Sequence, residues 1–185
     1  MVVKIQLSNS KKGSTSELTI NSDKVVNIYL CGPTVYNHVH IGNLRPVIIF
    51  DVLHRLLLTL DIKVNYIQNI TDIDDKIIVK AHQEKTSEKK ISNHYMKAYL
   101  ANLVRYNILF PKCFPLVSEY IPEIKKFVEQ LIEKKHAYQA GSEVFFRVEG
   151  NTKYGELSGQ KLKKLRSNFR TVALIDKEDK KDFVL

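Results

Sequence analysis

A thiol and an imidazole lie close together in one short stretch of the chain, residues 29–45. Gly32 follows the thiol of Cys31, and a glycine allows the backbone to approach a ligand closely. A second glycine, Gly42, lies two residues after the imidazole of His40. An apolar segment precedes the stretch and a long apolar-periodic segment follows it, which predicts a strand, a turn and a helix. Because the first N–H groups of a helix can bind an anion, the sequence predicts a nucleotide site of the α/β type.

A second polar run, residues 69–78, lies at the carboxyl end of the next expected strand. Ligands of parallel sheets bind outside the carboxyl ends of the strands, so this run and the turn at Cys31 should face one crevice. Thr71, Asp72 and Asp74 have an alternative role as caps of the following helix. From these residues alone, capping is the favoured interpretation.

Apolar periodicity predicts a βαβ unit around the first stretch. Residues 25–30 are apolar enough for a strand at the centre of a parallel sheet. Residues 44–60 predict a helix buried on more than one side, and residues 63–69 predict the second strand. Alternation in residues 1–7 and 17–20 predicts a hairpin ahead of this unit. The expected fold class is therefore α/β.

Beyond residue 109 the alternation of strands and helices breaks down, which indicates an insertion. The other expected elements are a Lys-rich helix at 86–107, a loop at 111–122, an amphipathic helix at 122–136, a hairpin at 137–148, a basic segment at 161–170 and a strand from Asp182. We expect the first half of a nucleotide-binding domain at 1–109 and an α+β insertion at 110–181. Residues 182–185 are expected to start the strand that returns to the first sheet.

Charge and composition narrow the function class. The 185 residues include 29 basic and 20 acidic side chains, a formal net charge of +9. This excess fits an RNA partner, and it fits a generally basic surface equally well. No apolar run reaches the length of a membrane span and no signal-peptide pattern is present. Cys31 and Cys113 form no disulfide framework, so we expect a cytoplasmic protein with reduced thiols.

Both polar runs resemble a known family. Residues 40–43, His-Ile-Gly-Asn, are similar to the HIGH signature of class I aminoacyl-tRNA synthetases, with Asn43 in place of the last histidine. The runs Cys-Gly-Pro-Thr-Val-Tyr at 31–36 and Asn-Ile-Thr-Asp-Ile-Asp-Asp-Lys at 69–76 resemble cysteinyl-tRNA synthetases. The similarity extends through the insertion to residues 182–185. It implies the first half of a Rossmann-like catalytic domain with a connective insertion, and the family continues beyond this point, so we expect a longer natural protein.

The resemblance implies a reaction: ATP-dependent ligation of cysteine to tRNA(Cys) through a cysteinyl adenylate, with Mg²⁺ accompanying ATP. The residues that it assigns to ATP binding are His40, Gly42 and Asn43, of which His40 and Asn43 are also catalytic. The residues that it assigns to the cysteine substrate are Cys31, Gly32, Thr34 and Thr71. Asp72 and Asp74 are candidates for orienting the substrate amino group or His40, and basic residues of 161–170 for touching the tRNA acceptor stem.

Zinc is also implied, with Cys31 as one of four ligands and the metal selecting the substrate thiol. The other ligands are expected downstream. One thiol does not complete a tetrahedral site even with His38 beside it, so zinc binding by these 185 residues alone should be weak or absent. Cys113 is expected in the insertion with a structural role.

Two alternatives stay open. One is the related ligase that joins cysteine to an amino sugar in the biosynthesis of a thiol cofactor. The other is an inactive fragment that binds RNA, with a steep salt dependence and no use of ATP. We expect a monomer with no membrane partner.

Overall fold

The computed structural model describes residues 4–20, 23–159 and 177–185. Their contacts divide the chain into two compact units, Ile20–Ile121 and Met1–Thr19 with Pro122–Leu185. We describe each unit by itself. The domain boundaries expected from the sequence concern the complete catalytic fold and stay predictions.

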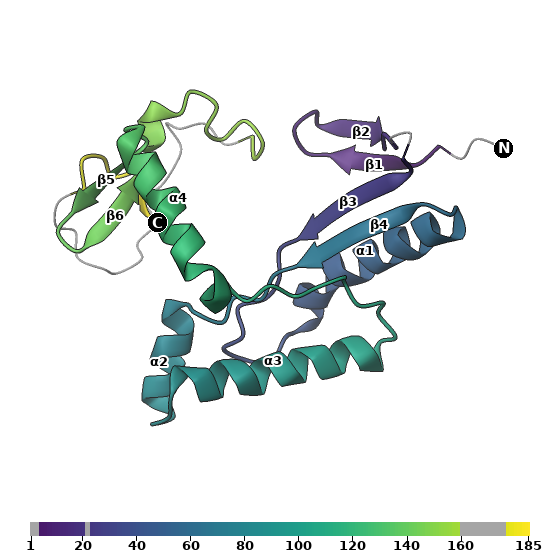
Figure 1. Cartoon of the computed structure of the whole chain (residues 1–185), viewed down its shortest axis with the longest axis horizontal. Coiled ribbons are helices and arrows are strands. Elements are labelled where there is room, and N and C mark those ends of the chain that lie inside the picture. The colour runs from purple at the N-terminus through teal and green to yellow at the C-terminus, as the bar shows by residue number, and fades with distance from the viewer. Residues whose placement is uncertain (1–3, 21–22, 160–176) are drawn as a thin grey trace. The chain divides into compact units, whose positions relative to one another are not determined.

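The first unit is built on a pair of parallel strands, β3 (Val25–Leu30) and β4 (Lys63–Gln68). They pair in register from Val25 opposite Lys63 to Leu30 opposite Gln68. Helix α1 (Ile41–Thr59) connects them (Figure 1). The expected strand–helix–strand unit is confirmed, and the helix begins three residues earlier than the apolar pattern predicts, because the first turn carries polar and glycine residues.

A third segment, residues 112–117, extends this sheet along the other edge of β4. Lys112 N–H donates to the Tyr66 carbonyl at 2.7 Å, and Ile70 N–H donates to the Pro115 carbonyl at 2.9 Å. Cys113 forms a parallel bridge with Ile67. Helices α2 (Asp75–Gln83) and α3 (Glu88–Arg105) make the crossover to it.

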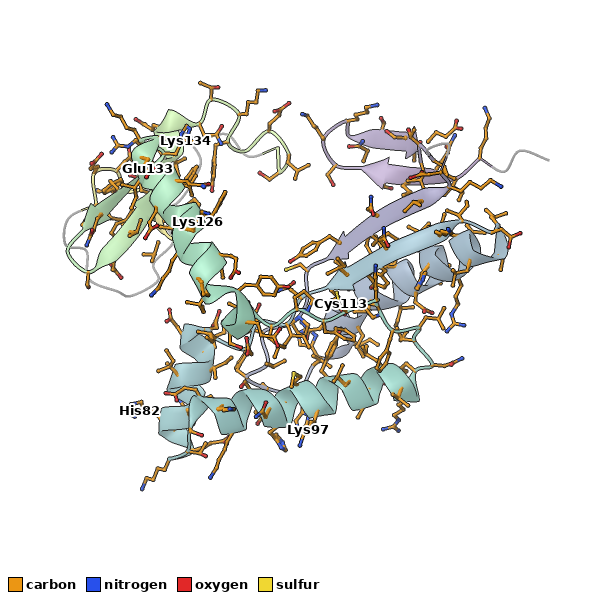
Figure 2. All side chains as sticks on the ribbon, viewed as in Figure 1. His82, Lys97, Cys113, Lys126, Glu133 and Lys134 are labelled. Carbon is orange, nitrogen blue, oxygen red and sulfur yellow. The ribbon has the colours of Figure 1, made fainter. Side chains whose placement is uncertain are left out.

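The loop that the sequence predicts at 111–122 contains no regular strand but has isolated bridges and the 3₁₀ turn Val117–Tyr120. Pro111 and Pro115 fit there because a proline is tolerated along a sheet edge where no N–H is needed. Cys113 lies in the sheet unit, and Figure 2 labels it on the segment beside β4. The expectation that Cys113 is part of the insertion stays a prediction.

Helices α1 and α3 cover one face of the sheet. Tyr66 and Gln68 are two residues apart on β4 and are almost fully buried, so both point to this face. The Tyr66 ring meets the His54 ring of α1 edge-on at 5.5 Å. The Tyr99 hydroxyl of α3 donates to Gln68 Oε1 at 2.8 Å, and burial raises the pKa of Tyr99 to about 12.

The opposite face of the sheet is exposed in this structure. Tyr29 of β3, on this face, is 65% exposed. On helix α1, the side chains of Ile49 and Val52 are 55% and 62% exposed. The expectation that α1 is buried on more than one side is therefore wrong here. The predicted central place of β3 also needs a strand on its second edge, and none of the described residues supplies one.

A partly buried polar cluster fastens α1 to the chain leaving α3. The Asp51 carboxylate is buried, pairs with Arg55 Nε at 2.8 Å and accepts from Leu109 N–H at 2.8 Å. His54 Nδ1 and the Tyr66 hydroxyl are buried beside it with no hydrogen-bond partner in the described part of the chain. Burial lowers the pKa of His54 below its ordinary value of 6.5, Asp51 opposes this and Arg55 adds to it.

His54 should make the fold less stable as the pH falls. As the pH falls below about 6.5, His54 of the unfolded chain binds a proton, whereas burial disfavours this protonation in the folded chain. Acid therefore favours the unfolded chain, and the free energy of unfolding decreases as the pH falls. Urea unfolding at about pH 7.5 and about pH 5.5 should show a smaller acid loss in His54→Gln than in the unsubstituted chain. His82→Gln, at an exposed site, is the matched control. Equal acid losses in all three proteins would contradict the assignment.

The second unit contains helix α4 and two small sheets. Its elements are β1 (Gln6–Asn9), β2 (Ser14–Glu17), α4 (Ile121–Glu133), β5 (Ala137–Ala140), β6 (Glu143–Phe146), the 3₁₀ turn Val148–Gly150 and β7 (Phe183–Val184). A further 3₁₀ turn, Val117–Tyr120, belongs to the first unit. The expected hairpins are present as antiparallel pairs β1–β2 and β5–β6 (Figure 1). The bounds of the first differ from the prediction, because β1 and β2 overlap the expected strands at 1–7 and 17–20 only in part.

β7 lies antiparallel to β6 and is the third strand of the small sheet β5–β6–β7. The expectation that residues 182–185 start a return strand to the catalytic sheet stays a prediction. Asp182 anchors it: its buried carboxylate accepts from the Tyr138 hydroxyl at 2.8 Å and from Val148 N–H at 2.9 Å. A strand register depends on such distant partners, which the local sequence does not reveal.

None of the helices in the described ranges is long and apolar enough to cross a membrane.

Candidate active site

The loops that follow β3 and β4 are hydrogen-bonded to each other. Val35 N–H donates to the Thr71 carbonyl at 3.1 Å, and Thr71 N–H donates to the Pro33 carbonyl at 3.1 Å. Thr34, which is half-buried, and Thr71 form a parallel bridge. The expectation that the Cys31 turn and the run 69–78 meet at the carboxyl ends of the strands is confirmed.

The Asn69 side chain links the loop that carries Thr71 to Gly32 and to the end of β3. Its Oδ1 accepts from Gly32 N–H at 2.9 Å and from the Tyr29 hydroxyl at 3.0 Å. Its Nδ2 lies 3.4 Å from Thr71 Oγ1. Sequence analysis gave Asn69 no role of its own; the signal available was an amide at the end of a strand, opening the polar run.

Gly32 is required by the closeness of the two loops. A Cβ added there would lie 1.6 Å from the Asn69 carbonyl oxygen and 2.7 Å from the Asn69 carbonyl carbon. Both atoms are backbone, so neither can swing aside. The glycine therefore sets the distance between the loop that carries Cys31 and the loop that carries Thr71.

His40 and Asn43 form a capping box at the start of α1. His40 Nδ1 accepts from Gly42 N–H at 3.1 Å, and Asn43 Oδ1 accepts from His40 N–H at 3.0 Å. A Cβ at Gly42 would lie 2.9 Å from His40 Cε1, so the glycine lets the imidazole fold back over the helix end.

The cap fixes which atoms face outward. A nitrogen that accepts a hydrogen bond carries no proton, so the neutral His40 ring holds its proton on Nε2 and can donate from there. The Asn43 amide nitrogen makes no hydrogen bond with the described part of the chain. Both side chains therefore offer a donor beside the positive end of the α1 dipole, which suits an anion.

Cys31 follows β3 directly and is exposed. Its sulfur lies 3.9 Å from the Gly32 carbonyl oxygen, a weak contact that leaves the thiol accessible. His38 turns toward α3, where its ring centroid lies 5.2 Å from that of Tyr95 and 6.1 Å from that of His94.

Asp74 caps the following helix, whereas Asp72 bonds to a distant segment. Asp74 Oδ1 accepts from Lys76 N–H at 2.9 Å, at the start of α2. The Asp72 carboxylate accepts from Ser118 N–H at 3.0 Å and from the Ser118 hydroxyl at 2.6 Å. Neither carboxylate contacts His40 in the described structure. The capping interpretation is confirmed for Asp74, and Asp72 instead joins the loop after β4 to Ser118.

Most of the chain also matches known proteins. A family model described as the tRNA synthetases class I (C) catalytic domain matches residues 17–185. The chain belongs to this family.

Three curated relatives, each named Cysteine--tRNA ligase, support the family assignment. The one from Mycoplasma capricolum subsp. capricolum is 47% identical over 88% of this chain and 36% of its own length. Those from Brevibacillus brevis and Malacoplasma penetrans are 42% and 41% identical, over 98% and 93% of this chain. The chain spans 36% to 40% of the length of these relatives. The predicted class I synthetase fold, a Rossmann-like half with a parallel sheet, is confirmed.

Cys31 fits the zinc that the synthetase resemblance implies, but only as one ligand. A thiolate is a donor that zinc prefers, and the Cys31 thiol is accessible at the edge of the sheet. The described residues gather no group of three or more His, Cys, Asp or Glu side chains able to hold a metal ion. A tetrahedral site would thus need donors beyond the described part of this chain. The basic segment 161–170, considered for tRNA contacts, lies outside the described residues.

Proposed function

We propose that this chain supplies the first half of an active site that activates cysteine with ATP and transfers it to tRNA(Cys). The observation that carries the proposal is the hydrogen-bonded pair of loops at the carboxyl ends of β3 and β4. One loop carries Cys31 and leads into the capped start of α1, and the other carries Thr71. The family membership and the names of the relatives support the same reaction.

The first step joins cysteine to the nucleotide. The cysteine carboxylate attacks the α-phosphate of ATP, the bond to the β-phosphate oxygen breaks, and pyrophosphate leaves with its Mg²⁺. His40 Nε2 donates to the phosphates as negative charge builds, while Gly42 and Asn43 hold the nucleotide at the N-terminus of α1. In the second step a ribose hydroxyl of the tRNA end attacks the cysteinyl carbonyl, and AMP leaves. The protein contributes position and charge stabilisation, with no covalent enzyme intermediate.

The loops provide the amino acid side of the site. Cys31 would hold zinc as the ligand from this half, Gly32 allows the substrate to lie against the backbone, and Thr34 and Thr71 frame its pocket. Bound zinc would supply a soft Lewis acid that takes a thiolate in preference to a hydroxyl, which selects cysteine over serine. Selection of this kind would make an editing site unnecessary. The formal net charge of +9 suits the tRNA partner.

Cysteine-dependent exchange of pyrophosphate into ATP tests the proposal. We expect exchange by the full-length gene product, none when serine replaces cysteine, and none by the 185-residue chain, whose described residues hold part of the site. Absence of exchange by the full-length product would remove every enzyme interpretation and leave the RNA-binding alternative. If exchange occurs, charging of tRNA(Cys) separates the synthetase from the ligase that acts on an amino sugar.

A further inference from the structure

The Asn69 side chain has a defined orientation. A backbone N–H can only donate, so the end of the amide that faces Gly32 N–H at 2.9 Å must be the carbonyl oxygen. The Tyr29 hydroxyl donates to the same oxygen at 3.0 Å. The opposite end of the amide is therefore the NH₂ group, and it faces Thr71.

This orientation determines what the Thr71 hydroxyl can do. Asn69 Nδ2 lies 3.4 Å from Thr71 Oγ1. Because an amide NH₂ group can only donate, the Thr71 oxygen is the acceptor of this hydrogen bond. A hydroxyl has one proton, and the Thr71 oxygen makes no other hydrogen bond with the described part of the chain. Its proton is thus unused at the edge where the two loops meet.

We propose that Asn69 is a positioning residue that makes Thr71 a hydrogen-bond donor to the bound amino acid. The proposal rests on the proposed function, because it takes cysteine as the ligand of these loops. The group that receives the Thr71 proton is then an acceptor of the bound amino acid, a carboxylate oxygen or the sulfur. Through its bonds to Gly32 and Tyr29, Asn69 also holds the Cys31 loop in place while it orients Thr71.

Asn69→Asp reverses the polarity of the link with little change in shape. One carboxylate oxygen can still accept from Gly32 and Tyr29, but the other now faces Thr71 as an acceptor. The Thr71 hydroxyl then donates its hydrogen bond to the new carboxylate at position 69, and the substrate no longer receives it. In the full-length gene product, the KM for cysteine in pyrophosphate exchange should rise about tenfold, while the KM for ATP stays within about twofold.

A double-mutant cycle with Thr71→Val separates this effect from the added negative charge. In the Thr71→Val background, where no hydroxyl remains to be turned, Asn69→Asp should raise the KM for cysteine by less than about threefold. Thr71→Ser keeps the hydroxyl and should retain most of the affinity. Far-UV circular dichroism and thermal unfolding of each variant confirm that it is folded.

Three outcomes can be told apart. A tenfold effect of Asn69→Asp that nearly vanishes beside Thr71→Val supports the proposal. An equal effect in both backgrounds, or an equal rise in the KM for ATP, overturns it and leaves the proposed function standing. Absence of cysteine-dependent exchange by the unsubstituted full-length product would remove the proposed function, and this inference with it.

Discussion

Cys31→Ser is expected to remove zinc and cysteine activation together from the full-length gene product. A serine hydroxyl is a poor zinc ligand, so the loss in metal affinity should exceed the roughly 10- to 100-fold that changes outside the ligand set cost. Zinc content after dialysis and cysteine-dependent pyrophosphate exchange measure the two effects. Cys113→Ser is the matched control, because Cys113 is also an exposed thiol of the sheet unit but lies on the edge segment 112–117.

The pattern of loss decides which part of the account is wrong. If activation survives while zinc is lost, the metal does not select the substrate. If zinc and activation both survive, Cys31 is not a ligand. If Cys113→Ser behaves like Cys31→Ser, the effect belongs to thiols in general and not to the loop after β3.

Gly32→Ala is expected to disrupt the junction of the two loops. The new Cβ would lie 1.6 Å from the Asn69 carbonyl oxygen, so one loop must move away from the other. We expect a loss of about 3 kcal/mol in the free energy of unfolding, at the upper end of the usual cost of overpacking. Urea unfolding of the 185-residue chain measures it, and exchange by the full-length product should fall even where the variant is still folded.

Gly150→Ala provides the comparison for this prediction. A Cβ at Gly150 would meet the Arg147 side chain at 3.7 Å, an ordinary contact, so the change should stay within about 0.5 kcal/mol. Similar stability of the two alanine variants would show that the approach of Asn69 to Gly32 does not constrain the loops.

The central part of the fold could be predicted because its signals are local. Val25–Leu30 is an apolar run of strand length, and the periodic segment after it is long enough to be a helix that returns the chain to a parallel partner. Once two parallel strands are expected, the meeting of their carboxyl-end loops follows from topology. The family resemblance then assigned roles to Cys31, His40 and Thr71, and those roles stay predictions.

The rest depends on partners that a local pattern does not identify. Cys113 and Leu116 form bridges with Ile67 and Ile70, more than 40 residues earlier in the chain, and such pairings have no signal in the local sequence. Ile49 and Val52 have the composition of buried residues, and their exposure here depends on what else is present to cover them. Asn69 could not be singled out, because its importance lies in which end of an amide faces which loop.

The bonds between the two turns also limit how such a site can vary. Asn69 approaches Gly32 with both its backbone and its side chain, so the glycine turn and the Asn-Ile-Thr run constrain each other's positions. Under the proposed function, changing the accepted amino acid would therefore require both turns to be exchanged together. A side chain introduced at position 32 against the present Asn69 backbone would clash before any question of selectivity arose.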